Sequence, residues 1–359
     1  MDNKTLCIKS TESSSGVYYE VPIDLPPLGV GGAGTVRKGF QINEKTGVRK
    51  EVAIKFLFDD LPESAIIRSE KEANIRIVHE NLVEMIDFVK VADKTDDIYG
   101  KSRAHYHVVS ELLHGVMLLD LIDGKIEEKE VSDNPKIKEF RDLMMYNRNA
   151  FAIKVVRGLL SGIMALHDNG FIHRDIDPSN IMITTDGKIK LIDLGVAKKI
   201  KDTTSTTSQN LTNNGQFIGK PAYASPELAD GDLAHQNETT DIYAIGIVLY
   251  QMVTGYLPFE GPIYEVLQMQ KTQKLPLSRV ANKKIRKIIE KATEKKQSDR
   301  YQSAAMFRAD LDALDDNESQ PVSDWYGMQE YIPWAVAVIS GLAFGILGEY
   351  LFEYLFIIK

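Results

Sequence analysis

One short segment of the chain combines residue types suited to proton transfer and metal binding. It reads His173-Arg174-Asp175-Ile176-Asp177-Pro178-Ser179-Asn180. A carboxylate such as that of Asp175 can orient a hydroxyl group and accept its proton, and the amide oxygen of Asn180 can bind a hard cation. Asp193, in Asp193-Leu194-Gly195, lies thirteen residues beyond Asn180 and offers a second oxygen ligand. Because Mg²⁺ binds through few protein oxygens together with phosphates and waters, this spacing suits a site for a Mg²⁺-bound phosphate.

A glycine-rich stretch nearer the N-terminus is a second candidate for phosphate binding. It reads Gly29-Val30-Gly31-Gly32-Ala33-Gly34-Thr35-Val36. Glycines allow the backbone to approach phosphates closely and to present its amide donors. Taken alone, the pattern also fits an ordinary glycine-rich turn. A dinucleotide-binding fold would need a helix directly after the glycines, whereas residues 36–40 continue as a second strand. A hairpin over phosphates is therefore favoured.

A lysine lies inside an apolar, β-branched stretch, residues 52–56, which predicts a strand. A buried Lys55 is costly unless a counter-charge meets it, and a solvent-facing lysine on an edge strand is the plainer alternative. The helical segment that follows, residues 66–79, offers Glu70 and Glu72 as partners. Counting back from the end of that segment favours Glu70, while Glu72 stays open.

These residues need a framework that brings them to one place. The first third of the chain has strand-like runs around one helical segment, and the remainder is mostly helical in character. Residues 151–167 and 242–254 are apolar almost all round, which predicts two buried helices. Residues 181–183 and 189–192 predict a strand pair between Asn180 and Asp193. The polar stretch 124–148 is expected to form loops or an exposed insertion.

In this order and spacing, the motifs resemble those of Hanks-type, or eukaryotic-like, serine/threonine protein kinases over residues 18–314. The resemblance implies an α+β fold with two lobes: a small antiparallel-sheet lobe over about 18–112 and a larger helical lobe over about 113–314. It also implies ATP with Mg²⁺, or Mn²⁺ as an alternative metal. The reaction would transfer the γ-phosphoryl group to Ser or Thr hydroxyls of protein substrates.

The same resemblance assigns a role to each motif. Lys55 would hold the α- and β-phosphates and pair with Glu70. Asp175 would be the catalytic base, and Asn180 with Asp193 would hold the metal. Ser110 would stand behind the adenine, where its small side chain leaves the rear of the pocket open. The other ATP-binding positions would be Gly29, Val30, Gly31, Gly32, Ala33, Gly34, Val36, Ala53, Met182 and a hinge from Glu111 to Leu113.

Later motifs extend the resemblance toward the C-terminus. Ser225-Pro226-Glu227 is similar to the A-P-E motif, and Glu227 would pair with Arg300. Asp241 would anchor the catalytic loop through its backbone. Small-molecule phosphotransferases generally lack the region from Ser225 to Asp241, which disfavours that class.

Two positions depart from the family pattern. Asp177 stands where a lysine is usual, and Lys220 stands where a threonine is usual. We hypothesise that Lys220 fills the space of the missing lysine and stabilises charge on the transferring phosphoryl group. The alternative is a pseudokinase that binds nucleotide and serves as a scaffold.

A hydroxyl-rich segment lies between Asp193 and Ser225. Residues 202–208 read DTTSTTS, and a phosphate on one of these hydroxyls could pair with Arg174. Autophosphorylation of this segment is therefore predicted, with an unmodified flexible loop as the alternative.

The composition limits the remaining possibilities. A net charge of −8 over 359 residues argues against broad nucleic-acid binding. The single cysteine, Cys7, fits a reducing compartment and argues against a cysteine-based metal site. Residues 1–17 are expected to be a disordered N-terminal tail. The formation of a dimer is left open.

The C-terminal part of the sequence predicts attachment to a lipid bilayer. Residues 315–330 form an acidic linker, and residues 331–358 are predicted to be a transmembrane or membrane-associated helix. About 18 residues from 331 onward lack charge, and nearby Trp and Tyr residues suit an interface. An interfacial helix and a helix buried on the domain are the alternatives, because Glu349 and Glu353 interrupt the segment. The kinase domain is placed on the cytoplasmic side because ATP is there.

Overall fold

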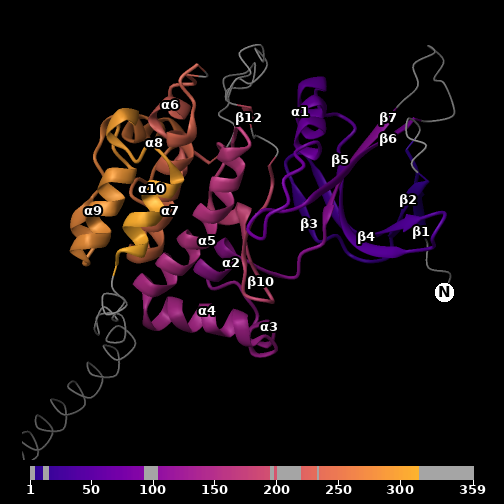
Figure 1. Cartoon of the computed structure of the whole chain (residues 1–359), viewed down its shortest axis with the longest axis horizontal. Helices are drawn as coiled ribbons and strands as arrows, with labels where there is room; N and C mark the ends of the chain where they lie inside the picture. Colours follow the sequence, from indigo (N-terminus) through magenta and orange to yellow (C-terminus); the bar gives the residue numbers. More distant parts are fainter. Residues whose placement is uncertain are drawn as a thin grey trace, which may run out of the picture. The chain divides into compact units, whose positions relative to one another are not determined.

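A computed structural model describes residues 5–10, 16–92, 104–194, 198–199, 220–232 and 234–314. Within these ranges, a small lobe built on a sheet precedes a larger helical lobe (Figure 1). The acidic linker 315–330 and the predicted membrane segment 331–358 lie outside the described residues, as does the hydroxyl-rich segment 202–208.

The small lobe is a seven-stranded antiparallel sheet in the order β1-β2-β4-β5-β7-β6, with β3 paired to β4. The apolar residues of one face form a core that includes Val52, Ile54 and Val109, all fully buried. One helix packs against β6 and β7. The elements are β1 (Thr5–Ile8), β2 (Val17–Pro22), β3 (Gly29–Gly31), β4 (Gly34–Asn43), β5 (Arg49–Leu57), α1 (Glu63–Ala73), β6 (Met85–Ala92) and β7 (Ala104–Glu111).

The expectation of a disordered tail over residues 1–17 is wrong for residues 5–8. They form β1, which pairs with β2 in a register that sets Leu6 opposite Val21. The physical reason is Ile8, which is only 3% exposed and joins the core of the small lobe. A short strand with one buried apolar residue leaves almost no periodic pattern, so the sequence alone does not predict it.

The large lobe surrounds two long apolar helices, α5 and α7, which are buried as predicted and which pack on each other. Its first elements are β8 (Gly115–Met117), α2 (Leu118–Ile122), α3 (Glu128–Ser132), α4 (Pro135–Tyr146), α5 (Arg148–Asp168), β9 (Phe171–Ile172), η1 (Pro178–Asn180), β10 (Ile181–Thr184), β11 (Ile189–Leu191) and β12 (Lys198–Lys199). They are followed by η2 (Pro221–Tyr223), α6 (Pro226–Ala229), α7 (Glu238–Thr254), α8 (Ile263–Thr272), η3 (Leu277–Arg279), α9 (Lys283–Ala292), η4 (Gln297–Asp299) and α10 (Ala304–Asp312).

Among the described residues, α5 is the one helix long and apolar enough to cross a bilayer by length and composition. However, 56% of that apolar stretch is buried inside the protein. Its apolar character is therefore explained by its place in the core of the helical lobe.

The expectation that residues 124–148 form loops or an exposed insertion is also wrong. Asn134 caps α4 by accepting hydrogen bonds from the N–H groups of Lys136 and Ile137, and a proline occupies the first turn. Ile137 and Phe140 are buried, and the rings of Phe140 and of Phe151 on α5 pack edge to face with their centroids 6.5 Å apart. Because only these two apolar side chains of α4 are fully buried, the charged residues between them hid the helical pattern.

Candidate active site

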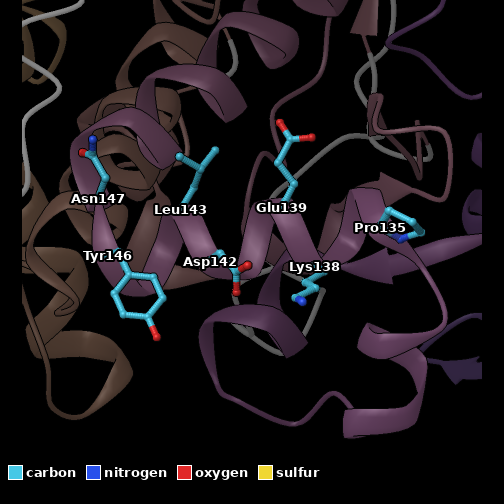
Figure 2. Close-up of a pocket in the computed structure, with 7 residues that line it drawn as sticks. All are labelled: Pro135, Lys138, Glu139, Asp142, Leu143, Tyr146 and Asn147. Atoms are coloured by element: carbon cyan, nitrogen blue, oxygen red, sulfur yellow. The ribbon is translucent and has the colours of Figure 1, made fainter.

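Nine of the predicted site residues line a cleft of about 650 Å³. Its walls come from β3, β4, β5 and β7 of the small lobe and from β8 and β10 of the large lobe. A second hollow of about 530 Å³ runs along α4, as Figure 2 shows, and none of the predicted residues line it. The predicted residues that line the cleft are Gly29, Val30, Val36, Ala53, Lys55, Glu111, Leu113, Met182 and Asp193.

The glycine-rich stretch forms the predicted hairpin, in which β3 pairs with β4 so that Gly31 lies opposite Gly34. A Cβ atom on Gly34 would lie 2.1 Å from the carbonyl oxygen of Phe56 on β5, so this position must be glycine for the strands to pair. A Cβ atom on Gly31 or Gly32 would meet nothing within 4 Å. These two positions therefore leave open space where a phosphate can approach the backbone.

Lys55 lies on β5, where its neighbours are Val36 on β4 and Val108 on β7. Its Nζ atom is 3.8 Å from Oδ2 of Asp193, and its side chain is 21% exposed. Burial lowers the pKa of Lys55, but the negative charges of Asp193 and Glu72 outweigh this effect and raise it above the ordinary value. The lysine therefore carries a positive charge inside the cleft, next to one of the predicted metal ligands.

The predicted partner of Lys55, Glu70, is wrong. Glu70 is exposed and lines a separate hollow between α1 and β6, whereas Glu72 is 5% exposed and lines the cleft. Two residues along a helix rotate the side chain by about 200°, so the two glutamates face opposite sides of α1. Burial and the charge of Asp193 raise the pKa of Glu72 to about 8, while Lys55 and the N–H of Leu194 act against this shift.

The catalytic loop brings Asp175 and Asn180 together. The Nδ2 atom of Asn180 donates to the backbone oxygen of Asp175 at 2.8 Å and to its Oδ2 at 3.2 Å. Burial raises the pKa of Asp175, and the charge of Asp177 adds to this effect. A raised pKa makes a carboxylate a stronger proton acceptor, as a general base requires.

Buried Asp241 holds the backbone of this loop in place, as predicted. Its carboxylate accepts hydrogen bonds from the N–H groups of His173 at 2.8 Å and Arg174 at 2.7 Å. Nε2 of His167 on α5 lies 2.8 Å from the same carboxylate. Arg174 has a φ angle of 71°, a left-handed conformation that is strained for a non-glycine residue. The side chain of Asp241 therefore compensates for a backbone shape that the loop needs.

Lys220 lies beside the catalytic loop, close to the position that the sequence hypothesis gives it. Its Nζ atom is 2.7 Å from Oδ1 of Asp177 and 2.5 Å from Oγ of Ser179. Asp177 is 1% exposed and also accepts a hydrogen bond from the N–H of Ser179. The ammonium therefore neutralises a buried carboxylate two residues from Asp175, and Ser179 connects it to the wall of the cleft.

The chemistry of the donor set fits a hard cation that arrives with phosphates. Asp193 supplies a carboxylate, and Asn180 keeps an amide oxygen while its nitrogen donates to Asp175. The charge of Asp193 raises the pKa values of both Glu72 and Asp175, so negative charge is concentrated at this point. Within the described residues, no group of three or more His, Cys, Asp or Glu side chains is placed to hold a metal alone. Two protein oxygens therefore need phosphate and water as further ligands.

The hinge contains an ion pair that the sequence did not reveal. The carboxylate of Glu111 pairs with Nζ of Lys190 on β11 and accepts the N–H of Glu84 at 2.9 Å. The backbone N–H of Glu111 donates to the oxygen of Glu84, also at 2.9 Å. This N–H therefore already has an acceptor, and an adenine base would form its hydrogen bonds with the carbonyl of Glu111 and with Leu113.

Glu227 and Arg300 form the predicted ion pair in the large lobe. Nη1 and Nη2 of Arg300 each lie within 2.9 Å of a Glu227 oxygen, and the arginine side chain is fully buried. Burial alone would raise the pKa of Glu227, but the hydrogen bonds and charge of Arg300 outweigh it and lower the pKa. The pair fixes the segment that follows Lys220 onto the helical lobe.

Comparison with known proteins agrees with this geometry. The protein kinase domain family matches residues 24–310. The serine/threonine-protein kinase PrkC of Bacillus subtilis is 31% identical over 73% of this chain and 36% of its own length. PknB of Mycobacterium leprae, also named a serine/threonine-protein kinase, is 30% identical over 79% of this chain and 41% of its own length. The chain thus spans about two fifths of the length of the curated relatives that it matches.

Proposed function

Because the chain belongs to the protein kinase family, we propose that it transfers the γ-phosphoryl group of ATP to Ser or Thr hydroxyls of protein substrates. The supporting observation is that Lys55 and Asp193, from separate segments, line one cleft 3.8 Å apart, while Asn180 donates to Asp175 and the charge of Asp193 raises the pKa of Asp175. Structural Asp and Asn turns would not need to lie next to a cleft that contains a charged lysine.

In the proposed mechanism, Lys55 binds the α- and β-phosphates, and the open glycine positions let the hairpin backbone donate to phosphate oxygens. Asp175 orients the acceptor hydroxyl and receives its proton. Asn180 and Asp193 would hold Mg²⁺, which would neutralise negative charge on the phosphates. Glu72 would keep Lys55 in place from α1.

Nucleotide binding and turnover, measured side by side, separate this proposal from the pseudokinase alternative. The wild-type chain should bind Mg·ATP and release ADP in the presence of a protein acceptor. The Asp175→Asn variant should bind nucleotide with affinity within about threefold of wild type, while its turnover falls by at least about 10²-fold. Wild-type binding without any turnover above the Asp175→Asn background would support the scaffold instead.

We also propose that Lys220 replaces the lysine missing from the catalytic loop. Its contacts with Asp177 and Ser179 place an ammonium beside the cleft, where it can stabilise charge on the transferring phosphoryl group. Lys220→Met should therefore lower kcat by roughly 10²-fold, and Lys129→Met on exposed α3 is the matched control. The double change Asp177→Lys with Lys220→Thr should restore part of the activity. Full activity of Lys220→Met would refute this role.

Phosphorylation within residues 202–208 is proposed as a switch. Nη1 of Arg174 donates to Oε1 of Gln236 at 3.2 Å, so a neutral amide oxygen is one of the partners of this guanidinium. A phosphate offers a charged acceptor and would compete with Gln236 for the guanidinium. Mass spectrometry after incubation with Mg·ATP should find phosphate in this segment. An active enzyme with an unmodified segment would contradict the switch.

Attachment to the bilayer through residues 331–358 is a further part of the proposed function. The support is the charge-free run in the sequence, and the kinase domain would lie on the cytoplasmic side. Cell fractionation should recover the full chain with membranes and a chain lacking residues 331–359 in the soluble fraction. Equal membrane recovery of both would refute the attachment.

A further inference from the structure

Helix α9 carries its charges on one side. Its sequence, KKIRKIIEKA, has five Lys or Arg residues and one Glu. Isoleucines on the inner side are buried against the large lobe, and exposed lysines lie on the outer side. We call this outer side the lysine face and define it by Lys283, Lys284, Lys287 and Lys291. The lysine face is therefore a locally positive surface on a chain whose net charge is −8.

An ordinary solvated helix face in the same lobe has a different composition. On α4, both signs of charge occur together: Lys138 points to the same side as Asp142 (Figure 2), and Nζ of Lys136 lies 3.1 Å from Oε2 of Glu139. On the lysine face the repeated sign is positive, and only Glu290 interrupts it within the helix. Like charges at helical spacing repel one another, so this face gains from an external negative surface.

The position of α9 brings this surface near the C-terminal end of the described domain. In Figure 1, α9 lies on the side of the helical lobe away from the sheet, and it packs on α7 and α10. Nζ of Lys291 lies 3.9 Å from Oδ2 of Asp310, in the last turn of α10. The sixteen residues 315–330 then lead to the charge-free run. Sixteen residues of chain reach at most about 55 Å.

We propose that the lysine face of α9 binds anionic lipid headgroups of the bilayer to which residues 331–358 attach the chain. The inference rests on the attachment proposed above, because the anchor keeps the face within reach of the headgroups. Each lysine near an anionic leaflet strengthens membrane partitioning by roughly fivefold. A nucleic acid fits less well, since α9 has no aromatic residue on which a base could stack.

The contact can be tested on the full chain with a single reporter on the lysine face. Glu290 is exposed and lies among the lysines, so Glu290→Cys in a Cys7→Ser background accepts a fluorophore without removing a lysine. Val48→Cys, 62% exposed in the small lobe, carries the same fluorophore as a reference. Each labelled chain is incorporated into phosphatidylcholine vesicles with or without 30% phosphatidylglycerol. Headgroup spin labels then quench any fluorophore at the bilayer surface.

Quenching at position 290 should be at least about threefold stronger in phosphatidylglycerol vesicles than in neutral ones, and 0.5 M NaCl should remove the difference. Reversing Lys283, Lys284 and Lys287 to Glu should abolish it. Reversing three exposed lysines elsewhere, Lys45, Lys129 and Lys138, should leave it unchanged. Phosphorylation of a soluble peptide by the α9 variant should stay at the wild-type level, which shows that the variant is folded.

Two results separate failure of this inference from failure of the anchor. Flotation in a density gradient shows whether the chain is attached to the vesicles. If the chain floats with both kinds of vesicle but the fluorophore at position 290 is quenched equally in both, the lysine face does not bind anionic lipid. If the chain stays at the bottom of the gradient with both kinds, the attachment itself fails, and the tethered contact fails with it. Binding of a fluorescent oligonucleotide that the α9 reversal removes, without lipid-dependent quenching, would identify a nucleic acid as the partner and overturn the proposal.

Discussion

The buried ion pair between Glu227 and Arg300 gives a prediction whose size follows from the contacts. Arg300 makes five hydrogen bonds of 3.0 Å or less: two to Glu227 and one to each of the backbone oxygens of Glu294, Thr239 and Lys295. Replacing Arg300 with Met removes all five donors. It leaves a carboxylate inside the protein with Thr240 Oγ1 as a remaining side-chain donor.

Breaking a buried ion pair by removing one partner costs about 3–5 kcal/mol. Arg300→Met should lie in this range, because three carbonyl oxygens also lose a donor. Glu227→Gln should cost less, because its amide oxygen still accepts from the guanidinium. The double change Glu227→Leu with Arg300→Met should be less destabilising than the sum of the single changes by at least about 1 kcal/mol, since no unpaired charge remains.

Urea titration of the full chain with pulse proteolysis measures these differences. Both tryptophans, Trp325 and Trp334, lie beyond the kinase domain, so tryptophan fluorescence would not report its unfolding. A loss of 3–5 kcal/mol corresponds to a fall in the midpoint of about 1 M or more. Arg279→Met, at an exposed arginine of the same lobe, is the control. If Arg300→Met shifts the midpoint no further than this control, the assigned role of the pair is wrong.

Three further predictions concern the cleft. Gly34→Ala should destabilise the small lobe, because the added Cβ would lie 2.1 Å from the backbone oxygen of Phe56, and it should weaken nucleotide binding by at least about tenfold. A thermal shift assay measures the loss of stability, and Gly32→Ala should leave folding unchanged in it. Ser110→Met should fill the rear of the pocket. In competition binding, the affinity of inhibitors that extend behind the adenine should fall by at least about tenfold, whereas the affinity of ATP should change by less than about threefold. Burial and Asp193 keep the pKa of Glu72 near 8, so it is protonated below that pH. Binding of Mg·ADP would neutralise the charge of Asp193 and so lower the pKa of Glu72, and the affinity measured by calorimetry should therefore rise from pH 6 to 8, by up to about tenfold per pH unit. Glu72→Gln should remove this pH dependence beyond the titration of the nucleotide itself.

The sequence was most informative where chemistry fixes both residue type and spacing. The sequence predicts Lys55, Asp175, Asn180 and Asp193 as site residues because proton transfer and metal binding accept few side chains, and in the structure Lys55 lies next to Asp193 and Asn180 next to Asp175. The apolar helices α5 and α7 could be predicted because they are buried on nearly all sides. Both kinds of signal are local in the sequence and strong.

The sequence was less informative where the choice depends on a rotation or on distant packing. Glu70 and Glu72 lie on one helix, and only the tertiary structure decides which of them faces the cleft. The Glu111–Lys190 pair joins residues that are far apart in the chain, so no spacing rule could find it. In β1, the burial of Ile8 depends on strands that follow it, and the four residues alone do not show it.

The most direct test of the central claim is transfer of ³²P from γ-labelled ATP to the chain itself and to a generic protein acceptor. With Mg²⁺ present, acid hydrolysis of the labelled proteins should yield phosphoserine or phosphothreonine, and the Asp175→Asn chain should give at most about 1% of that label. Label that persists at the wild-type level in Asp175→Asn, or no label above background in the wild-type chain, would contradict the assignment of this cleft as a protein kinase active site.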